Sequence, residues 1–283
     1  MAGASMKDIK LRIKSVESTM QITKAMQLVA TSKLRRAKER MESSKPYTRI
    51  SQEALAAAVA SCEDVTVPFV SPREVKRRCY VVIAGDRGLA GGYNNNVLKM
   101  AAAEMEGRDV TVLPIGKKAV EFFRRRKKPI YSELYNEAAD LSVGDCFSMA
   151  RTLCEGYLKG EFDEIHVAFT TFVSVLTQQA TTLKLLPLTV EPTDDASAAK
   201  QDILYEPDAE SVFNVIVPEY LGGLVYGALC ESIASELGAR RTAMDSATKN
   251  AKEMIDTLNL QYNRARQGAI TQEITEIVAG SQD

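Results

Sequence analysis

The chain has 283 residues, of which 45% are hydrophobic and 26% are charged. This composition is typical of a globular protein and excludes an intrinsically disordered or collagen-like chain. Residues 1–14 lack the apolar run of a secretory signal, and no stretch approaches the roughly 18 uninterrupted apolar residues of a membrane span. We therefore expect a protein on the cytosolic side.

The formal net charge is −1, but the charge is unevenly distributed along the chain. Residues 1–50 carry 12 basic and 4 acidic side chains, whereas residues 51–239 carry 18 basic and 27 acidic ones. The positive first segment predicts a partner with an acidic surface. Because it lacks the interleaved aromatic side chains that stack on bases, we expect an acidic protein and no nucleic acid.

Residues 5–60 contain no glycine and are predicted to form one long helix, in which Pro46 is a candidate site for a kink or break. A heptad repeat with alternating spacings of four and three residues, typical of a coiled coil, runs through this helix. Its members are Ile9, Ile13, Val16, Met20, Thr23, Gln27, Ala30, Leu34, Ala37 and Met41. A second apolar row through Ile22, Met26 and Val29 indicates that the helix contacts a further surface.

The next part of the chain alternates between predicted strands and helices. The predicted strands are 78–85, 109–116, 129–132, 164–174 and 181–188. The predicted helices are 94–105, 117–126 and 143–159. Such alternation favours an α/β domain of the doubly wound, Rossmann-like class with a sheet rich in parallel strands.

A second long helical run begins near Pro218 and repeats apolar or small residues at heptad spacing. Its predicted seam is Met244, Ala247, Ala251, Met254, Leu258, Gln261, Ala265 and Gly268. We expect the two terminal helices to pair as a long antiparallel coiled coil. The resulting division of the chain is an N-terminal coiled-coil helix at 1–60, a central α/β domain at 75–190, a connecting loop at 191–207 and a C-terminal coiled-coil helix at 208–283.

The cysteine and histidine content argues against a metal site or a catalytic centre. The five cysteines are scattered without a CxxC spacing, and the only histidine is His166. A zinc site needs clustered ligands, and a catalytic triad needs a histidine with a recognisable nucleophile motif. We expect inert buried thiols, a core histidine, no metal ligands and no catalytic residues.

The segment GDRGLAGGYNNN at 85–96 follows a strand and opens a helix, which is where phosphate-binding loops lie. Its glycines, at 85, 88, 91 and 92, fit neither GxGxxG nor GxxxxGK[ST]. We interpret it as a tight turn in which glycines allow close approach to another surface, and we expect no bound nucleotide or other cofactor. The basic run RRRKK at 124–128 is interpreted as a solvated helix end.

Three segments resemble signature segments of the gamma subunit of the rotary proton-translocating ATP synthase. They are ITKAMQLVATSKLRRA at 22–37, DRGLAGGYN at 86–94, and the long stretch from 239 to 280. LLPL at 185–188 and LYEP at 204–207 match further positions, so the resemblance spans the chain in the right order. It implies two terminal helices coiled into a shaft with a small α/β domain at its foot.

The resemblance implies a non-catalytic rotor in the central stalk. In that family the shaft turns inside a ring of alpha and beta subunits, and the foot binds epsilon and the c ring of the membrane sector. Rotation couples ion flow to ATP synthesis or hydrolysis in the head, and the gamma chain itself binds no nucleotide. The expected location is peripheral, on the cytoplasmic side of the cell membrane.

The resemblance also assigns ten residues to contacts with beta subunits. Those beside the acidic lever of one beta subunit are Ile22, Lys24 and Met26. Those in a loop near another lever are Arg87, Gly88 and Gly91. Those that reach a catch loop are Arg266, Gln267, Thr271 and Glu273.

Two features distinguish this sequence from chloroplast and mitochondrial chains of the family that it resembles. The stretch 190–205 lacks the paired regulatory cysteines of chloroplast-type chains, and the start lacks a mitochondrial transit segment, so a bacterial type is expected.

Two alternative functions fit the sequence less well. A nucleotide-dependent α/β enzyme with coiled-coil arms would need a phosphate loop, which the glycine spacing does not supply. A long-armed chaperone or RNA-binding hairpin would need arm helices adjacent in sequence, whereas these helices are the two ends of the chain.

Overall fold

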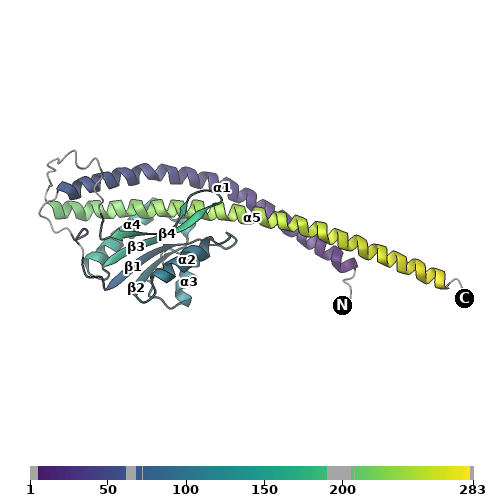
Figure 1. Cartoon of the computed structure of the whole chain (residues 1–283). Helices are drawn as coiled ribbons and strands as arrows, with labels where there is room; N and C mark the ends of the chain where they lie inside the picture. Colours follow the sequence, from purple (N-terminus) through teal and green to yellow (C-terminus); the bar gives the residue numbers. More distant parts are fainter. Residues whose placement is uncertain (1–5, 62–67, 72, 190–204, 207, 281–283) are drawn as a thin grey trace. The chain divides into compact units, whose positions relative to one another are not determined.

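The computed structural model describes residues 6–61, 68–71, 73–189, 205–206 and 208–280 (Figure 1). The chain forms two compact units, Met1–Thr31 with Arg240–Asp283 and Ser32–Ala239, and each is described by itself. The terminal helices α1 (Met6–Ser61) and α5 (Ala209–Gly280) contribute to both units. Most of the predicted connecting loop at 191–207 lies outside the described residues.

In the first unit, α1 and α5 pair in antiparallel directions. The hydroxyl oxygens of Thr23 and Thr248 are 2.8 Å apart, and Gln27 Nε2 donates to Asp245 Oδ1 at 2.8 Å. Residue numbers therefore rise along one helix as they fall along the other. The predicted seam of α1 is confirmed, because all its members from Ile9 to Ala30 are buried or half-buried.

The predicted seam of α5 is only partly correct. Met244, Ala251 and Leu258 are buried as predicted. The predicted members that are exposed instead are Met254, Gln261 and Gly268. The half-buried residues that complete the seam are Thr248, Ile255 and Tyr262. From Met244 to Tyr262 the seam residues are spaced four, three, four, three and four residues apart. This spacing fits a heptad repeat as well as the predicted spacing of three and four does.

The second unit contains a four-stranded sheet in the order β2-β1-β3-β4. Its strands are β1 (Arg77–Ile83), β2 (Asp109–Ile115), β3 (Glu164–Phe172) and β4 (Gln178–Leu186). β1 runs parallel to both β2 and β3, while β4 is antiparallel to β3. The predicted strand at 129–132 is wrong as an extended strand, since it forms a single bridge between Ile130 and Val112.

Helices cover both faces of this sheet (Figure 1). α2 (Tyr93–Glu104) and α3 (Lys117–Arg125) cover the face onto which Tyr80 and Val82 project. α4 (Val143–Leu158) and α5 cover the opposite face, onto which Val81 and Ile83 project. A short 3₁₀ helix, η1 (Ala138–Asp140), precedes α4. The predicted fold class, with long terminal helices and a doubly wound central domain, is confirmed.

α5 begins at Ala209, ahead of the helical run predicted near Pro218 but inside the predicted C-terminal segment 208–283. It continues through Pro218, as α1 continues through Pro46. By length and composition alone, α5 is also apolar enough to cross a membrane, with a window of mean hydropathy 1.4 that is 50% buried. The core helix of a globular protein meets the same criterion. Here Val217, Leu221 and Leu229 are fully buried in the core beside the sheet.

Gly116, which follows β2, is the glycine whose replacement should disturb the fold most. Its φ is +89°, and a Cβ at this position would lie 2.1 Å from the Ala84 carbonyl oxygen. We expect Gly116→Ala to lower the free energy of unfolding by about 2–4 kcal/mol, because backbone strain and a steric clash add. Urea denaturation of the full chain measures this change.

Gly107→Ala is the matched control. Gly107 has a φ of +70°, but a Cβ there would meet nothing within 4 Å. Its replacement should lower the free energy of unfolding by only about 1 kcal/mol, from backbone strain alone. Equal losses in the two variants would contradict the predicted clash.

Candidate partner-contact surfaces

One side chain, that of Asn94, holds the first part of the glycine loop, residues 85–92. Asn94 Oδ1 accepts a hydrogen bond from the Gly85 backbone N–H at 2.8 Å. The Asn94 Nδ2 group donates to the Arg87 carbonyl at 3.1 Å. A single side chain at the start of α2 thereby joins the end of β1 to the tip of the loop.

Asp86 fixes the same loop against its neighbours. Its Oδ1 accepts from the backbone N–H groups of Lys117 at 3.2 Å and Ala138 at 3.0 Å, and its Oδ2 accepts from that of Ala139 at 3.1 Å. These donors lie at the starts of α3 and η1, where backbone N–H groups lack helical partners and favour a negative charge. Asp86 therefore has a structural role in this loop.

The tip of the glycine loop is exposed and conformationally strained. Arg87, Gly88 and Gly91 all lie on the surface. Between them, Leu89 is 65% exposed and has a φ of +63°, a left-handed conformation that leucine rarely adopts. An apolar side chain that is both strained and exposed is a candidate contact residue. The sequence does not indicate Leu89 as a contact residue, because its strain arises from the conformation of the loop.

The loop also packs against α5 within the second unit. Ala90 and Tyr93 form a small buried cluster with Ala239. The loop approaches the helix on its inner side and presents Arg87, Gly88 and Leu89 outward. This agrees with the prediction of a tight turn that brings backbone close to another surface.

The residues predicted on α1 flank its seam in the first unit. Ile22 is 58% exposed, Met26 is half-buried, and Lys24 Nζ donates to Gln27 Oε1 at 3.2 Å. Val29, from the same apolar row, is also exposed. The row through Ile22 and Val29 therefore leaves apolar surface available to a further partner, as its position beside the seam predicted.

The residues predicted on α5 form a separate exposed group. Its members Arg266, Gln267, Thr271 and Glu273 are all exposed. Residue 266 is 18 positions beyond Thr248, which meets Thr23 across the seam, so it lies about 27 Å further along the helix. The structure thus separates this group from the one around Ile22. Arg87, Gly88 and Gly91 belong to the other unit.

The basic run and the histidine have structural surroundings. Arg124 pairs with Glu133 at 2.5 Å, and the Arg126 guanidinium lies 3.7 Å above the Phe122 ring. Both arginines remain exposed, as expected for a solvated helix end. His166 stacks on Tyr80 and lies 3.2 Å from Glu164 Oε2. Burial lowers the pKa of His166, so the neutral form is favoured in this half-buried position beside the core.

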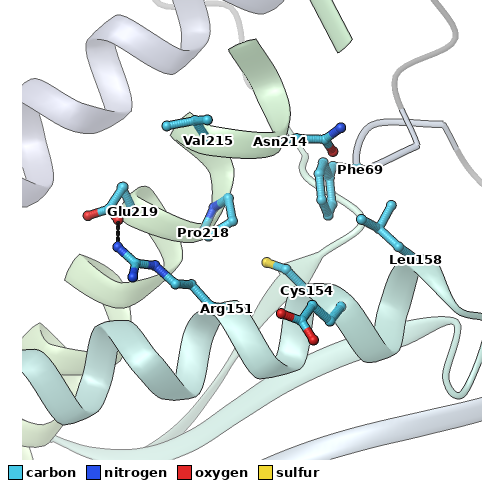
Figure 2. Close-up of a pocket in the computed structure, with 9 residues that line it drawn as sticks. Phe69, Arg151, Cys154, Leu158, Asn214, Val215, Pro218 and Glu219 are labelled. Atoms are coloured by element: carbon cyan, nitrogen blue, oxygen red, sulfur yellow. Dashed lines mark hydrogen bonds and ion pairs between the residues drawn. The ribbon is translucent and has the colours of Figure 1, made fainter. Parts of the chain in front are cut away.

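A cleft of about 360 Å³ lies between α4 and α5 (Figure 2). Arg151 donates to Glu219 across it at 2.6 Å, and Cys154 lies in its wall. Burial raises the pKa of Cys154 to about 12, so its thiol is protonated and a poor nucleophile. None of the predicted contact residues line this cleft. Across the described residues, no group of three or more His, Cys, Asp or Glu side chains is placed to hold a metal ion.

Replacement of Asp86 should loosen the glycine loop. We expect Asp86→Ala to lower the free energy of unfolding by about 2–3 kcal/mol, because three backbone N–H groups lose a charged acceptor. Hydrogen exchange at the Ala138 and Ala139 amides should accelerate. Asp109→Ala, which removes an exposed ion pair with Arg77, should change stability by less than about 1 kcal/mol. Unchanged exchange in Asp86→Ala would contradict the structural role.

Comparison with known proteins places this chain in a family. The ATP synthase family model matches residues 5–282. ATP synthase gamma chains from Heliobacterium modesticaldum and Ruminococcus albus are 44% and 46% identical to it, and each match covers 98% of both chains. A chain in the Euglena gracilis mitochondrial ATP synthase structure shares its fold, with a TM-score of 0.65, 17% identity, and coverage of 98% of this chain and 93% of that one. The chain belongs to the ATP synthase gamma-chain family.

Proposed function

We propose that this chain is the rotor subunit in the central stalk of an ATP synthase. It couples ion flow through the membrane sector to ATP synthesis or hydrolysis in the catalytic head by rotation. The observation that carries the proposal is the relationship to gamma chains over almost the whole length of the chain. The antiparallel pairing of α1 with α5 supports it, because a paired shaft resists bending better than a single helix.

The chain acts within a membrane-associated, multi-subunit ATPase. In this proposal its partners are the ring of alpha and beta subunits, the epsilon subunit and the c ring, and it is peripheral on the cytoplasmic side. The helices at 1–60 and 208–283 form the shaft, and the domain at 75–190 forms the foot. The chain is not catalytic by itself. The raised pKa values of the buried thiols of Cys79, Cys146 and Cys154 support this, because protonated thiols are poor nucleophiles.

Charge and exposure support two of the proposed contacts with acidic levers of beta subunits. On α1, the exposed Ile22 and Lys24 and the half-buried Met26 combine apolar surface with a positive charge. On the glycine loop, Arg87 and Leu89 offer the same combination beside Gly88 and Gly91. A partner that carries both carboxylates and apolar side chains is complementary to each surface.

A crosslink inside the shaft tests rotation directly. The Thr23 and Thr248 hydroxyl oxygens lie 2.8 Å apart across the seam, so cysteine sulfurs at these positions would face each other. We expect Thr23→Cys with Thr248→Cys to form a disulfide and to leave ATP turnover and ion pumping of the assembled complex unchanged, since both residues rotate together. Oxidised and reduced complexes are compared in the same preparation.

The control crosslink joins parts that move relative to each other. A Lys24→Cys variant, oxidised onto a cysteine in the lever of a beta subunit, should stop turnover until a reductant is added. Continued turnover in this crosslinked complex would overturn the rotor proposal.

Arg266 and Gln267 are proposed to contact the catch loop of a beta subunit. Both point away from the seam, in which Tyr262 and Ala265 lie. A charge-assisted hydrogen bond contributes about 1.5–3 kcal/mol, so Arg266→Ala with Gln267→Ala should lower ATP turnover and coupling several-fold. The melting temperature of the isolated chain should stay near that of the parent.

The matched control is Asn250→Ala with Lys252→Ala, another exposed polar pair on α5. It should leave turnover and coupling unchanged. Unchanged turnover in the first variant would remove Arg266 and Gln267 from the mechanism. A large fall in its melting temperature would show instead that they stabilise the fold.

A further inference from the structure

The sheet of the second unit is incomplete beside the end of β3. β1 pairs with β3 from Arg78 opposite Glu164 to Val82 opposite Ala168, but β3 continues to Phe172. β4 occupies the other side of β3 over these last residues. The backbone groups of Thr170 and Phe172 that point toward β1 therefore have no neighbouring strand, and buried backbone groups require partners.

Side chains of α5 supply these partners. Ser232 Oγ accepts a hydrogen bond from the Thr170 backbone N–H at 3.1 Å, and Ser235 Oγ donates to the Thr170 carbonyl at 3.1 Å. Glu231 Oε2 accepts from the Phe172 N–H at 3.4 Å. Ser232 and Ser235 are fully buried. One turn of α5 thus takes the place of a strand, and we call Ser232, Ser235 and Thr170 the serine clamp.

The same part of α5 lies very close to the sheet and to the glycine loop. A Cβ on Gly85 would lie 2.8 Å from the Glu236 carboxyl carbon. A Cβ on Gly238 would lie 3.4 Å from the Phe172 ring. Gly85 leads into the glycine loop, and Phe172 leads into the turn between β3 and β4. The clamp therefore lies where α5 meets both surface loops.

The clamp differs physically from the rest of the contact between α5 and the sheet. That contact is formed by apolar side chains such as Leu221, Val225 and Leu229, whose packing energy depends weakly on direction. Hydrogen bonds weaken steeply when their angle changes. Because Thr170 both donates to one serine and accepts from the other, movement of α5 along or around its own axis breaks at least one bond.

We propose that Ser232 and Ser235 are positioning residues that carry torque between the α/β domain and α5. This inference rests on the proposed rotor function. The serines act on partners only through the glycine loop and the helix that they hold in register. When α5 is loaded, the clamp keeps the sheet and its glycine loop from slipping along the helix.

The test uses Ser232→Ala with Ser235→Ala in the complete complex, reconstituted in vesicles. The matched control is Ser148→Ala with Ser246→Ala, which removes two exposed hydroxyl groups from α4 and α5. We expect ATP hydrolysis without an ion gradient to equal that of the parent. The maximum ion gradient sustained by ATP should fall about twofold or more in the clamp variant only, because unpaired buried groups weaken the joint.

Hydrogen exchange on the full chain confirms that the clamp has opened. The Thr170 amide should exchange about tenfold faster in the clamp variant than in the parent or the control. A parental ion gradient together with fast Thr170 exchange would overturn the proposal, as would an equal loss in the control.

Failure of the double variant to assemble and failure of the parent complex to pump ions are distinguished as follows. If the double variant does not assemble, Ser232→Ala and Ser235→Ala are measured singly with the same two readouts, and a parental gradient with fast exchange again overturns the proposal. If the parent complex itself hydrolyses ATP without pumping ions, the proposed rotor function fails, whatever the clamp does.

Discussion

The close approach of α5 to the sheet is the constraint on which the second unit depends. β3 extends beyond β1, and the backbone groups of Thr170 are buried there, so a partner must reach them. Only short side chains allow a helix to come near enough, and α5 has Ser232, Ala234 and Ser235 there, with Gly238 and Ala239 one turn later. The glycine loop then packs on this turn through Ala90 and Tyr93. A bulky residue at any of these positions would separate the helix from both the sheet and the loop.

The long helices and their seams could be predicted from the sequence where a single pattern of apolar residues was present. The α1 seam follows a heptad of apolar residues interrupted only by Thr23 and Gln27, and both of these make hydrogen bonds across the seam. The α5 seam was ambiguous because two adjacent residues can both be apolar seam candidates, such as Met254 and Ile255. Sequence spacing could not choose between them, since the choice depends on which residue faces α1. The helical pattern of α5 is recognisable only from near Pro218, because proline is favoured in the first turn of a helix, whereas the helix itself begins at Ala209.

The candidate contact surfaces were predictable as exposed segments, but not the interactions that shape them. Asp86 binds the backbone of residues 117, 138 and 139, which no local pattern relates to it. The serine clamp joins residues more than sixty positions apart in the same way. Leu89 could not be predicted as a contact residue, because its left-handed conformation follows from these tertiary constraints and not from the conformational preference of leucine. The family resemblance predicts roles for these residues, whereas tertiary contacts explain their positions.

The support of the glycine loop has a consequence for how such a chain evolves. The side chains that hold the loop, Asp86 and Asn94, flank its tip, where the side chains of Arg87 and Leu89 are exposed. Both side chains can therefore be exchanged without unfolding the domain, with glycine or asparagine favoured at position 89 by its left-handed backbone. A loop built in this way behaves as an exchangeable module, in which the recognised surface can diverge together with that of a partner while the scaffold stays constant.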